Sequence, residues 1–254
     1  MGDEQTYLLP LGIITITILV IFYYVFNNLW YNEISDKLTK GEKDNLKLGQ
    51  QKMTEMLRQF DKFCRKHGLK YWLVGGTLIG AVRHKGWIPH DADIDVCMTD
   101  TDFRILEKSI QKELPSDIWF QSLVTDPHYT SPPPLLGKIR NLNYCYIDCK
   151  DRNWHNGIQI DIFIYTENNG ILDIPPHNYG NDVYPMKYDD VFPLKELTFE
   201  GINVYAQNNY ISYLKNVWGY PPPELPIEER YPHEGRIGKT QNWIKNKYPL
   251  LYDS

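Results

Sequence analysis

The sequence predicts an α+β fold, in which a mixed β-sheet is flanked by helices and preceded by one N-terminal transmembrane helix. An uncharged, mostly apolar run fills residues 8–30. Helical and strand-like patterns then alternate over residues 42–124, and further strand-like runs follow. Such an order of elements is typical of a domain built on a mixed sheet. Because single domains of this size are common, we expect one core behind the N-terminal segment.

The first element follows a short tail at residues 1–7 and is expected to be a membrane anchor. Residues 8–30 read LLPLGIITITILVIFYYVFNNLW. About twenty apolar residues span a bilayer core of about 30 Å, and Tyr23, Tyr24 and Trp30 are typical of an interfacial aromatic belt. A cleaved signal peptide and a buried core helix are the alternatives. No basic residue precedes the run and no small-residue cleavage site follows it, which favours an uncleaved anchor.

A stem and a helix are expected at residues 31–68. Apolar side chains recur at helical spacing over residues 42–67, and Gly68 is placed to end that helix. The elements predicted after it are a strand at 70–74, a helix at 77–84, a strand at 93–98, a helix capped by Asp100 or Thr101 that runs to about Leu114, strands at 118–124, 139–147, 157–165 and 197–205, and a helix at 209–218. Residues 131–137 and 174–185 are predicted loops, and residues 226–254 an irregular tail.

A glycine pair and two aspartates mark the candidate site. Gly75 and Gly76 stand between a strand and a helix, where a backbone without side chains can approach an anion. Asp93 and Asp95, two residues apart on a strand, project to the same side. Two carboxylates so close repel each other unless a cation lies between them. Mg²⁺ or Mn²⁺ is the usual cation, and a solvated acidic edge is the alternative.

A third carboxylate stands alone on the apolar strand GIQIDIFIY. Asp161 lies between Ile160 and Ile162, and an isolated aspartate in an apolar strand is costly unless it is paired or bound to metal. Exposure on an edge strand is the alternative. A glycine pair, an Asp-x-Asp strand and a distant strand aspartate together predict a nucleotidyltransferase-type metal site, with Asp93, Asp95 and Asp161 as ligands.

Basic residues are candidates for contact with a transferring phosphoryl group. The candidates are Arg83, His84 and Lys85, which follow the glycine pair, and Lys138, which is expected on a later strand. Positive charge stabilises phosphoryl transfer. Solvated surface positions are the alternative for these basic residues. The net charge of −5 argues against a nucleic-acid partner. The four cysteines leave zinc, a Cys145–Cys149 disulfide and free thiols open.

Four stretches resemble the LicD/fukutin family of phosphotransferases, within the nucleotidyltransferase superfamily. GGTLIGAVRHKGWIPHDADIDV (75–96) resembles the family's glycine pair, basic helix end and aspartate run, and NGIQIDIFIY (156–165) resembles its second block. VFPLKELTFEGINVYA and YISYLKNVWGYPPPELP resemble the C-terminal blocks. The resemblance implies a nucleotidyltransferase-like catalytic domain at residues 69–225. His90 stands where the family usually has tryptophan, a departure that leaves the three carboxylates intact.

The resemblance also implies an activity and roles. The family moves a phospho-alcohol, such as phosphocholine or ribitol phosphate, from a CDP-linked donor to a glycan hydroxyl. By resemblance, Asp93 and Asp95 would hold Mg²⁺ or Mn²⁺, and Asp161 would complete the site or activate the acceptor. The remaining roles that the resemblance implies are a pyrophosphate seat at Gly75, Gly76 and Thr77, neutralising charge from Arg83 and Lys138, and a supporting or basic role for Asp91.

Two other functions and two locations stay open. A nucleotidyltransferase that moves a nucleotide, and a non-catalytic sugar-binding membrane scaffold, are the alternative functions. Lys37, Lys40 and Lys43 follow the anchor, and by the positive-inside rule they favour a cytoplasmic domain. The resemblance to animal members instead implies the lumen of the Golgi or another endomembrane compartment. We expect a single-pass membrane protein with a luminal domain.

Overall fold

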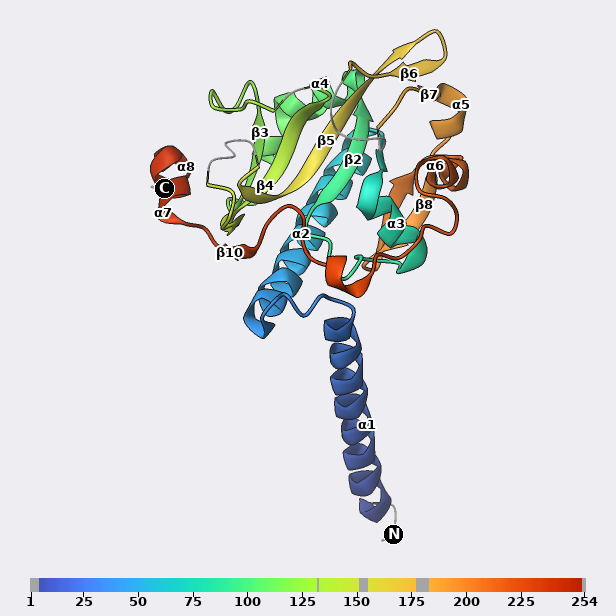
Figure 1. Ribbon diagram of the computed structural model, residues 1–254, viewed down its shortest axis with the longest axis vertical. Coiled ribbons are helices and arrows are strands. Elements are labelled where there is room, and N and C mark those ends of the chain that lie inside the picture. The colour runs from blue at the N-terminus through green and yellow to red at the C-terminus, as the bar shows by residue number, and fades with distance from the viewer. Residues whose placement is uncertain (1–4, 132, 151–154, 177–182, 253–254) are drawn as a thin grey trace.

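The computed structural model describes residues 5–131, 133–150, 155–176 and 183–252 (Figure 1). Parts of the predicted N-terminal tail, of both predicted loops and of the C-terminal end lie outside these residues. The described elements, in chain order, are α1 (Gln5–Asn32), α2 (Lys40–His67), β1 (Tyr71–Leu73), α3 (Gly75–Arg83), β2 (Ile94–Thr99), α4 (Asp100–Ser109), β3 (Ile118–Ser122), β4 (Leu135–Tyr146), β5 (Gly157–Asn168), β6 (Ile171–Asp173), β7 (Met186–Lys187), α5 (Tyr188–Val191), β8 (Lys195–Phe199), β9 (Ile202–Ala206), α6 (Tyr210–Val217), β10 (Ile237–Lys239), α7 (Asn242–Lys247) and α8 (Pro249–Tyr252).

The central sheet is mixed, as the sequence predicts. Its main path runs β1-β2-β5-β4-β10, with β3 also paired to β4, and with β6 and β7 continuing from β5. Strands β2 and β5 are parallel, whereas the other described pairs of this sheet are antiparallel. Strands β8 and β9 form a separate hairpin. The parallel pairing of β2 with β5 is what places the two aspartate-bearing strands side by side.

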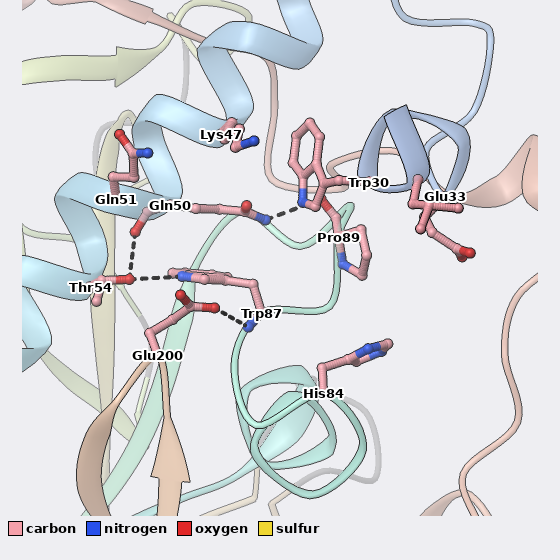
Figure 2. Close-up of a pocket in the computed structure, with 11 residues that line it drawn as sticks. Trp30, Glu33, Lys47, Gln50, Gln51, Thr54, His84, Trp87, Pro89 and Glu200 are labelled. Carbon is pink, nitrogen blue, oxygen red and sulfur yellow. Dashed lines mark hydrogen bonds between the residues drawn. The ribbon is translucent and has the colours of Figure 1, made fainter. Parts of the chain in front are cut away.

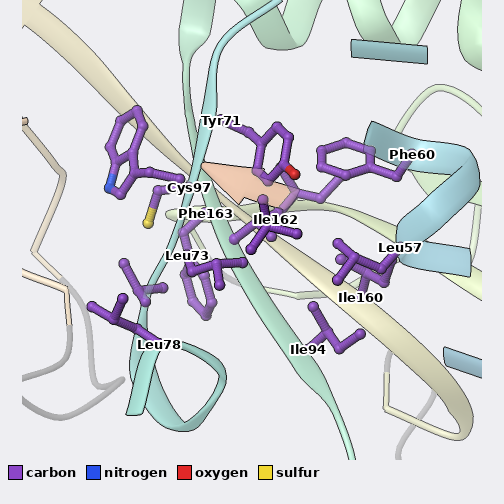
Figure 3. Packing of buried hydrophobic residues seen from close by; sticks show 14 of the residues in the cluster. Leu57, Phe60, Tyr71, Leu73, Leu78, Ile94, Cys97, Ile160, Ile162 and Phe163 are labelled. Carbon is purple, nitrogen blue, oxygen red and sulfur yellow. The ribbon is translucent and has the colours of Figure 1, made fainter. Parts of the chain in front are cut away.

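Helix α2 belongs to the core of the domain. Thr39 and Glu42 form a capping box at its start, and Gly68, in the left-handed region at φ 67°, ends it. Its buried face includes Leu57 and Phe60, which pack against the isoleucines of β2 and β5 on one side of the sheet (Figure 3). Because strand side chains alternate between faces, Asp95 and Asp161 project from the opposite side.

Three local expectations are wrong. The side chain of Thr99, one residue before the expected caps, accepts a hydrogen bond from the Asp102 amide, and α4 ends at Ser109. Strand β4 begins at Leu135, inside the predicted proline-rich loop. The single strand predicted at 197–205 is the β8–β9 hairpin, whose two-residue turn has positive φ at both Glu200 and Gly201. That backbone suits a tight hairpin, but glutamate is not a usual residue for it.

The segment expected as an irregular tail contributes to the fold. Strand β10 pairs with the end of β4, and Ile244 and Tyr248 of the following helical segment pack with Trp119 and Cys145. Between β9 and β10 the chain carries Glu234, a carboxylate oxygen of which lies within 4.8 Å of oxygens of Asp91 and Asp93. The C-terminal segment can therefore supply side chains to the site.

Helix α1 projects away from the domain, with its described side chains exposed along most of its length (Figure 1). Residues Gly12–Asn32 are long and apolar enough to cross a membrane. All four cysteines are buried free thiols, so Cys145 and Cys149 form no disulfide.

Candidate functional site

Three neighbouring strands place charged side chains in one row. Asp95 of β2 lies opposite Asp161 of β5 in the parallel register, and Lys138 of β4 lies opposite Asp161 in the antiparallel register. Side chains opposite each other on adjacent strands share a face of the sheet. The row therefore brings together two aspartates that are 66 positions apart in the sequence and a lysine between them in chain order.

The aspartates form two overlapping groups of carboxylates. Oxygen atoms of Asp93, Asp95 and Asp161 all lie within 4.8 Å of one another. Oxygen atoms of Asp91, Asp93 and Glu234 meet the same criterion, so Asp93 belongs to both groups. The structure thus brings together the three ligands that the sequence predicts, keeps Asp91 beside them, and adds Glu234.

The glycine pair at the start of α3 lies against these carboxylates. A Cβ atom on Gly75 would lie 2.9 Å from Oδ2 of Asp95, and one on Gly76 would lie 2.6 Å from Oδ2 of Asp91. Gly75 also has φ 57°, a conformation that favours glycine. The first turn of α3 therefore lies close against the carboxylates, and the amides at the start of a helix favour an anion bound beside them.

Hydrogen bonds fix the backbone that carries Asp91, Asp93 and Asp95. The side-chain amide of Gln50, on α2, donates to the carbonyl of Asp91 at 2.9 Å. The Tyr146 hydroxyl donates to the carbonyl of Ala92 at 2.6 Å. Thr77 is buried, and its hydroxyl accepts a hydrogen bond from the Asp95 amide at 2.9 Å. Thr77 thus holds the aspartate strand in place.

Asp161 is held by a buried polar chain. The amine of Lys138 donates to Oδ1 of Asp161, and the side-chain amide of Gln159 donates to Oδ2 at 3.2 Å. The same Gln159 nitrogen lies 3.0 Å from Nδ1 of His155, whose ring stacks on Tyr146. Lys138 is fully buried, so its position in this structure makes it the neutralising partner of Asp161.

Burial sets the electrostatics of the group. It raises the pKa of Asp93 well above its ordinary value, and the charges of Glu234, Asp95 and Asp91 raise it further. Burial and Glu234 likewise raise the pKa of Asp91, and burial raises that of Glu234 to about 7. So many carboxylates in a small volume are under strong mutual repulsion, which a bound cation would relieve.

Glu234 is the member of the site that the sequence reasoning missed. It lies after a proline-rich stretch without periodicity, in the expected tail, so no strand or helix pattern points to it. The Sγ atom of Cys149 donates a hydrogen bond to the Glu234 carbonyl at 3.0 Å, which fixes this stretch of backbone beside β4. Oε2 of Glu234 is buried and has no hydrogen-bond partner among the residues that the structure describes.

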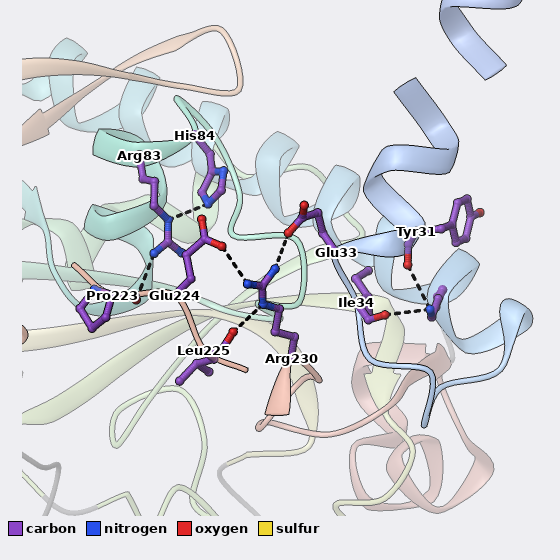
Figure 4. A network of polar contacts seen from close by, with 10 residues as sticks. Tyr31, Glu33, Ile34, Arg83, His84, Pro223, Glu224, Leu225 and Arg230 are labelled. Atoms are coloured by element: carbon purple, nitrogen blue, oxygen red, sulfur yellow. Dashed lines mark hydrogen bonds and ion pairs between the residues drawn. The ribbon is translucent and has the colours of Figure 1, made fainter. Parts of the chain in front are cut away.

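The predicted basic cluster lies at the other end of α3. Arg83 is the last residue of this nine-residue helix, about 12 Å from the glycine pair at 1.5 Å per residue. Its guanidinium donates to the carbonyls of Pro222 and Pro223 and to Nε2 of His84 (Figure 4). Lys85 is exposed beyond the helix. The structure therefore does not gather Arg83, His84 and Lys85 with the three carboxylates.

The carboxylates suit a hard divalent cation. Asp93, Asp95 and Asp161 offer oxygen ligands only, which is the donor set of Mg²⁺ and Mn²⁺. The residues present therefore fit the ion that the sequence predicts.

Comparison with known proteins finds a matching family model and several relatives. The family model described as LicD/FKTN/FKRP, nucleotidyltransferase domain, matches residues 68–209, more than half of the chain. An uncharacterized protein of Rickettsia typhi is 30% identical over 194 residues, covering 74% of this chain and 52% of that protein.

Two relatives carry names that describe an activity. Lipopolysaccharide cholinephosphotransferase LicD of Haemophilus influenzae is 36% identical over 119 residues, which cover 43% of this chain and 40% of that protein. Ribitol 5-phosphate transferase FKRP of Mus musculus is 27% identical over 175 residues, covering 68% of this chain and 32% of that protein. In these three comparisons the chain spans about half the length of the relative or less. Glu234 lies beyond the end of the family match.

Proposed function

Because the chain belongs to the LicD/FKTN/FKRP nucleotidyltransferase-domain family, we propose that it is a metal-dependent phosphotransferase that moves a phospho-alcohol from a CDP-linked donor to a glycan hydroxyl. The observation that carries this proposal is that carboxylate oxygens of Asp93, Asp95 and Asp161 lie within 4.8 Å of one another, with Asp95 and Asp161 on two parallel strands and Asp93 directly before the first of them. The two named relatives, a cholinephosphotransferase and a ribitol 5-phosphate transferase, support transfer of an alcohol phosphate.

Asp93, Asp95 and Asp161 would hold Mg²⁺ or Mn²⁺. When bound, the ion supplies positive charge that offsets the charge of the donor's diphosphate. Lys138 and Gln159 orient Asp161, and Thr77 and Gln50 fix the backbone of Asp95 and Asp91. The amides of Gly75 and Gly76, at the positive end of α3, face the same space and are suited to the diphosphate.

The reaction forms one bond to phosphorus and breaks another. The acceptor oxygen bonds to the phosphorus that carries the alcohol, the bond from that phosphorus to the CMP oxygen breaks, and CMP leaves. The acceptor hydroxyl loses its proton. Asp91 and Glu234 are candidates to receive it, because burial raises the pKa of both carboxyls and raises that of Glu234 to about 7.

We further propose that α1 anchors this domain to a membrane through residues 8–30. The exposed, uncharged helix and its aromatic end support this location. A luminal domain in the Golgi or another endomembrane compartment is the location we propose, with the cytoplasmic side as the alternative that the flanking lysines favour. Protease protection of the domain in sealed microsomes distinguishes the two sides.

A donor screen tests the activity. CDP-choline, CDP-ribitol and CDP-glycerol would each be incubated with the full chain and Mn²⁺, with and without a glycan extract, and the nucleotide products separated. Release of CMP that depends on Mn²⁺ and on Asp93 is the expected result. Pyrophosphate release from a nucleoside triphosphate would instead identify nucleotide transfer. Absence of Mn²⁺ and CDP binding by calorimetry would identify a non-catalytic scaffold.

A further inference from the structure

A cavity separate from the carboxylate site lies at the end of the domain where α1 joins it. Its volume is about 370 Å³, within the range of small-ligand sites. Its walls come from the last turns of α1, from the middle of α2, from the segment after α3 and from the β8–β9 turn (Figure 2). The lining includes Trp30, Lys47, Gln51, His84, Trp87 and Glu200.

The lining favours a neutral, polyhydroxylated ligand. Trp30 provides aromatic surface, Trp87 contributes a ring that is only 7% exposed, and Gln51 provides an amide with both donor and acceptor atoms. Glu33 is paired with Arg230, and the opposite charges of Glu200 and Lys47 offset each other in the rest of the lining. Burial and the charge of the neighbouring Arg83 lower the pKa of His84. This lining offers a diphosphate no net positive charge, whereas a sugar can present an apolar face to the Trp30 ring and hydroxyls to the Gln51 amide.

This cavity shares a wall with the carboxylate site. The segment from Trp87 to Asp91 carries Pro89 on the cavity and the first aspartate of the site at its end. The side-chain amide of Gln50 lines the cavity and binds the carbonyls of both Pro89 and Asp91, at 3.1 and 2.9 Å. A ligand seated in the cavity therefore contacts the same short segment that positions Asp91.

The cavity also lies at the level where a membrane surface is expected. Leu29 and Trp30, in the last turns of α1, line it, and the amine of Lys47 lies 5.1 Å from the Trp30 ring centroid. Arg230 forms ion pairs with Glu33 at the end of α1 and with Glu224 (Figure 4). The amine of Lys43 donates to the carbonyls of Tyr31 and Ile34. These contacts fix the end of α1 against the domain.

We propose that this cavity binds the sugar of a membrane-attached glycan, so that the acceptor is held at the bilayer surface beside Asp91. The inference rests on the proposed transfer to a glycan and on the anchoring role of α1. It names the acceptor class as a glycolipid and separates the acceptor cavity from the carboxylate site, where the donor binds.

Photo-crosslinking of the full chain tests this site. Benzoylphenylalanine would replace Gln51, which is exposed on the cavity wall, or Gln59, which lies on the same helix outside the cavity. Each protein would be placed in phosphatidylcholine nanodiscs that contain hexadecyl glycosides of glucose, galactose, mannose or N-acetylglucosamine. Mass spectrometry after irradiation would measure glycoside adducts. Methyl glycosides of the same sugars serve as the soluble comparison.

We expect about tenfold more adduct at position 51 than at position 59 for at least one membrane glycoside, the ratio that 1.4 kcal/mol of preference gives. Equal labelling at the two positions, adducts with phosphatidylcholine alone, or no adduct would overturn the proposal. Labelling as strong with methyl glycosides would overturn membrane attachment of the acceptor. The Asp93→Asn protein should keep the adduct but lose CMP release, so failure of the cavity and failure of the proposed reaction give different results.

Discussion

Gly76 lies directly against the carboxylate of Asp91, because a Cβ atom at position 76 would come within 2.6 Å of Oδ2. Replacing Gly76 with alanine should displace Asp91 and, through the shared segment, Asp93. Since misplacement by about 1 Å can cost about a hundredfold in rate, we expect a loss of that order in CMP release. Gly41→Ala is the matched control, because its Cβ meets nothing within 4 Å. Equal activity of the two variants would contradict this role for Gly76.

Asp93→Asn should separate activity from stability. The substitution removes the carboxylate that belongs to both acidic groups. Mn²⁺-dependent turnover should therefore fall by about a thousandfold, which corresponds to several kcal/mol of transition-state stabilisation by the ion. The metal-free protein should melt at a higher temperature, because a buried repulsive charge is gone. Asp173→Asn, an exposed aspartate on β6, is the control. A variant with wild-type metal-dependent turnover would show that Asp93 is not a ligand.

Lys138→Met should destabilise the domain. The substitution leaves Asp161 without its buried partner, and breaking a buried pair in this way costs about 3–5 kcal/mol of unfolding free energy. The double variant Lys138→Met, Asp161→Asn removes both charges and should recover much of that loss. Urea unfolding in EDTA measures both free energies. If the single variant is as stable as the double variant, Lys138 does not compensate the buried charge of Asp161, and the prediction is wrong.

The stabilising effect of Mn²⁺ should grow as the pH rises. Burial raises the folded-state pKa of Asp91, Asp93 and Glu234, the last to about 7. Groups with a raised pKa favour the folded state in their protonated form. Their contribution is therefore present at low pH and is lost as the pH rises from the ordinary carboxylate range through about 7.

A bound cation replaces those protons, so Mn²⁺ should raise the melting temperature more near pH 8 than near pH 5. Thermal unfolding with Mn²⁺ or EDTA at the two pH values measures the difference. The double variant Asp93→Asn, Glu234→Gln should show a flatter dependence. A Mn²⁺ effect that is equal at both pH values would be evidence against cation binding at these carboxylates.

Charges placed in α1 should release the protein from membranes. Arginine at the centre of a spanning helix costs about 2.5–3.5 kcal/mol for insertion, so Ile16→Arg with Val20→Arg should prevent stable spanning. Alkaline carbonate extraction should leave the wild type in the membrane pellet and move the double variant to the supernatant. Ile16→Leu with Val20→Leu keeps the segment apolar and serves as the control. A wild type found wholly in the supernatant would contradict the anchor.

Local patterns predicted most of the elements because a helix or strand face repeats over a few residues. The α2 helix, its Gly68 end and the strands bearing Asp95 and Asp161 follow from such patterns, although β2 begins at Ile94, one residue after Asp93. The Glu200-Gly201 turn was not predicted by a local pattern, because the pairing of β8 with β9 imposes a positive φ on a glutamate. Propensity is a weak guide where tertiary contacts decide the backbone.

The sequence by itself determined that carboxylates, a glycine pair and an apolar anchor are present, since each is encoded by neighbours in the chain. Only the tertiary structure decided which of them meet. The β2–β5 register puts Asp95 opposite Asp161, the antiparallel β4 gives Lys138 to Asp161, and the β10 segment delivers Glu234. The length of α3 keeps Arg83 away. Contacts between distant segments depend on register and packing, which spacing along a chain does not specify.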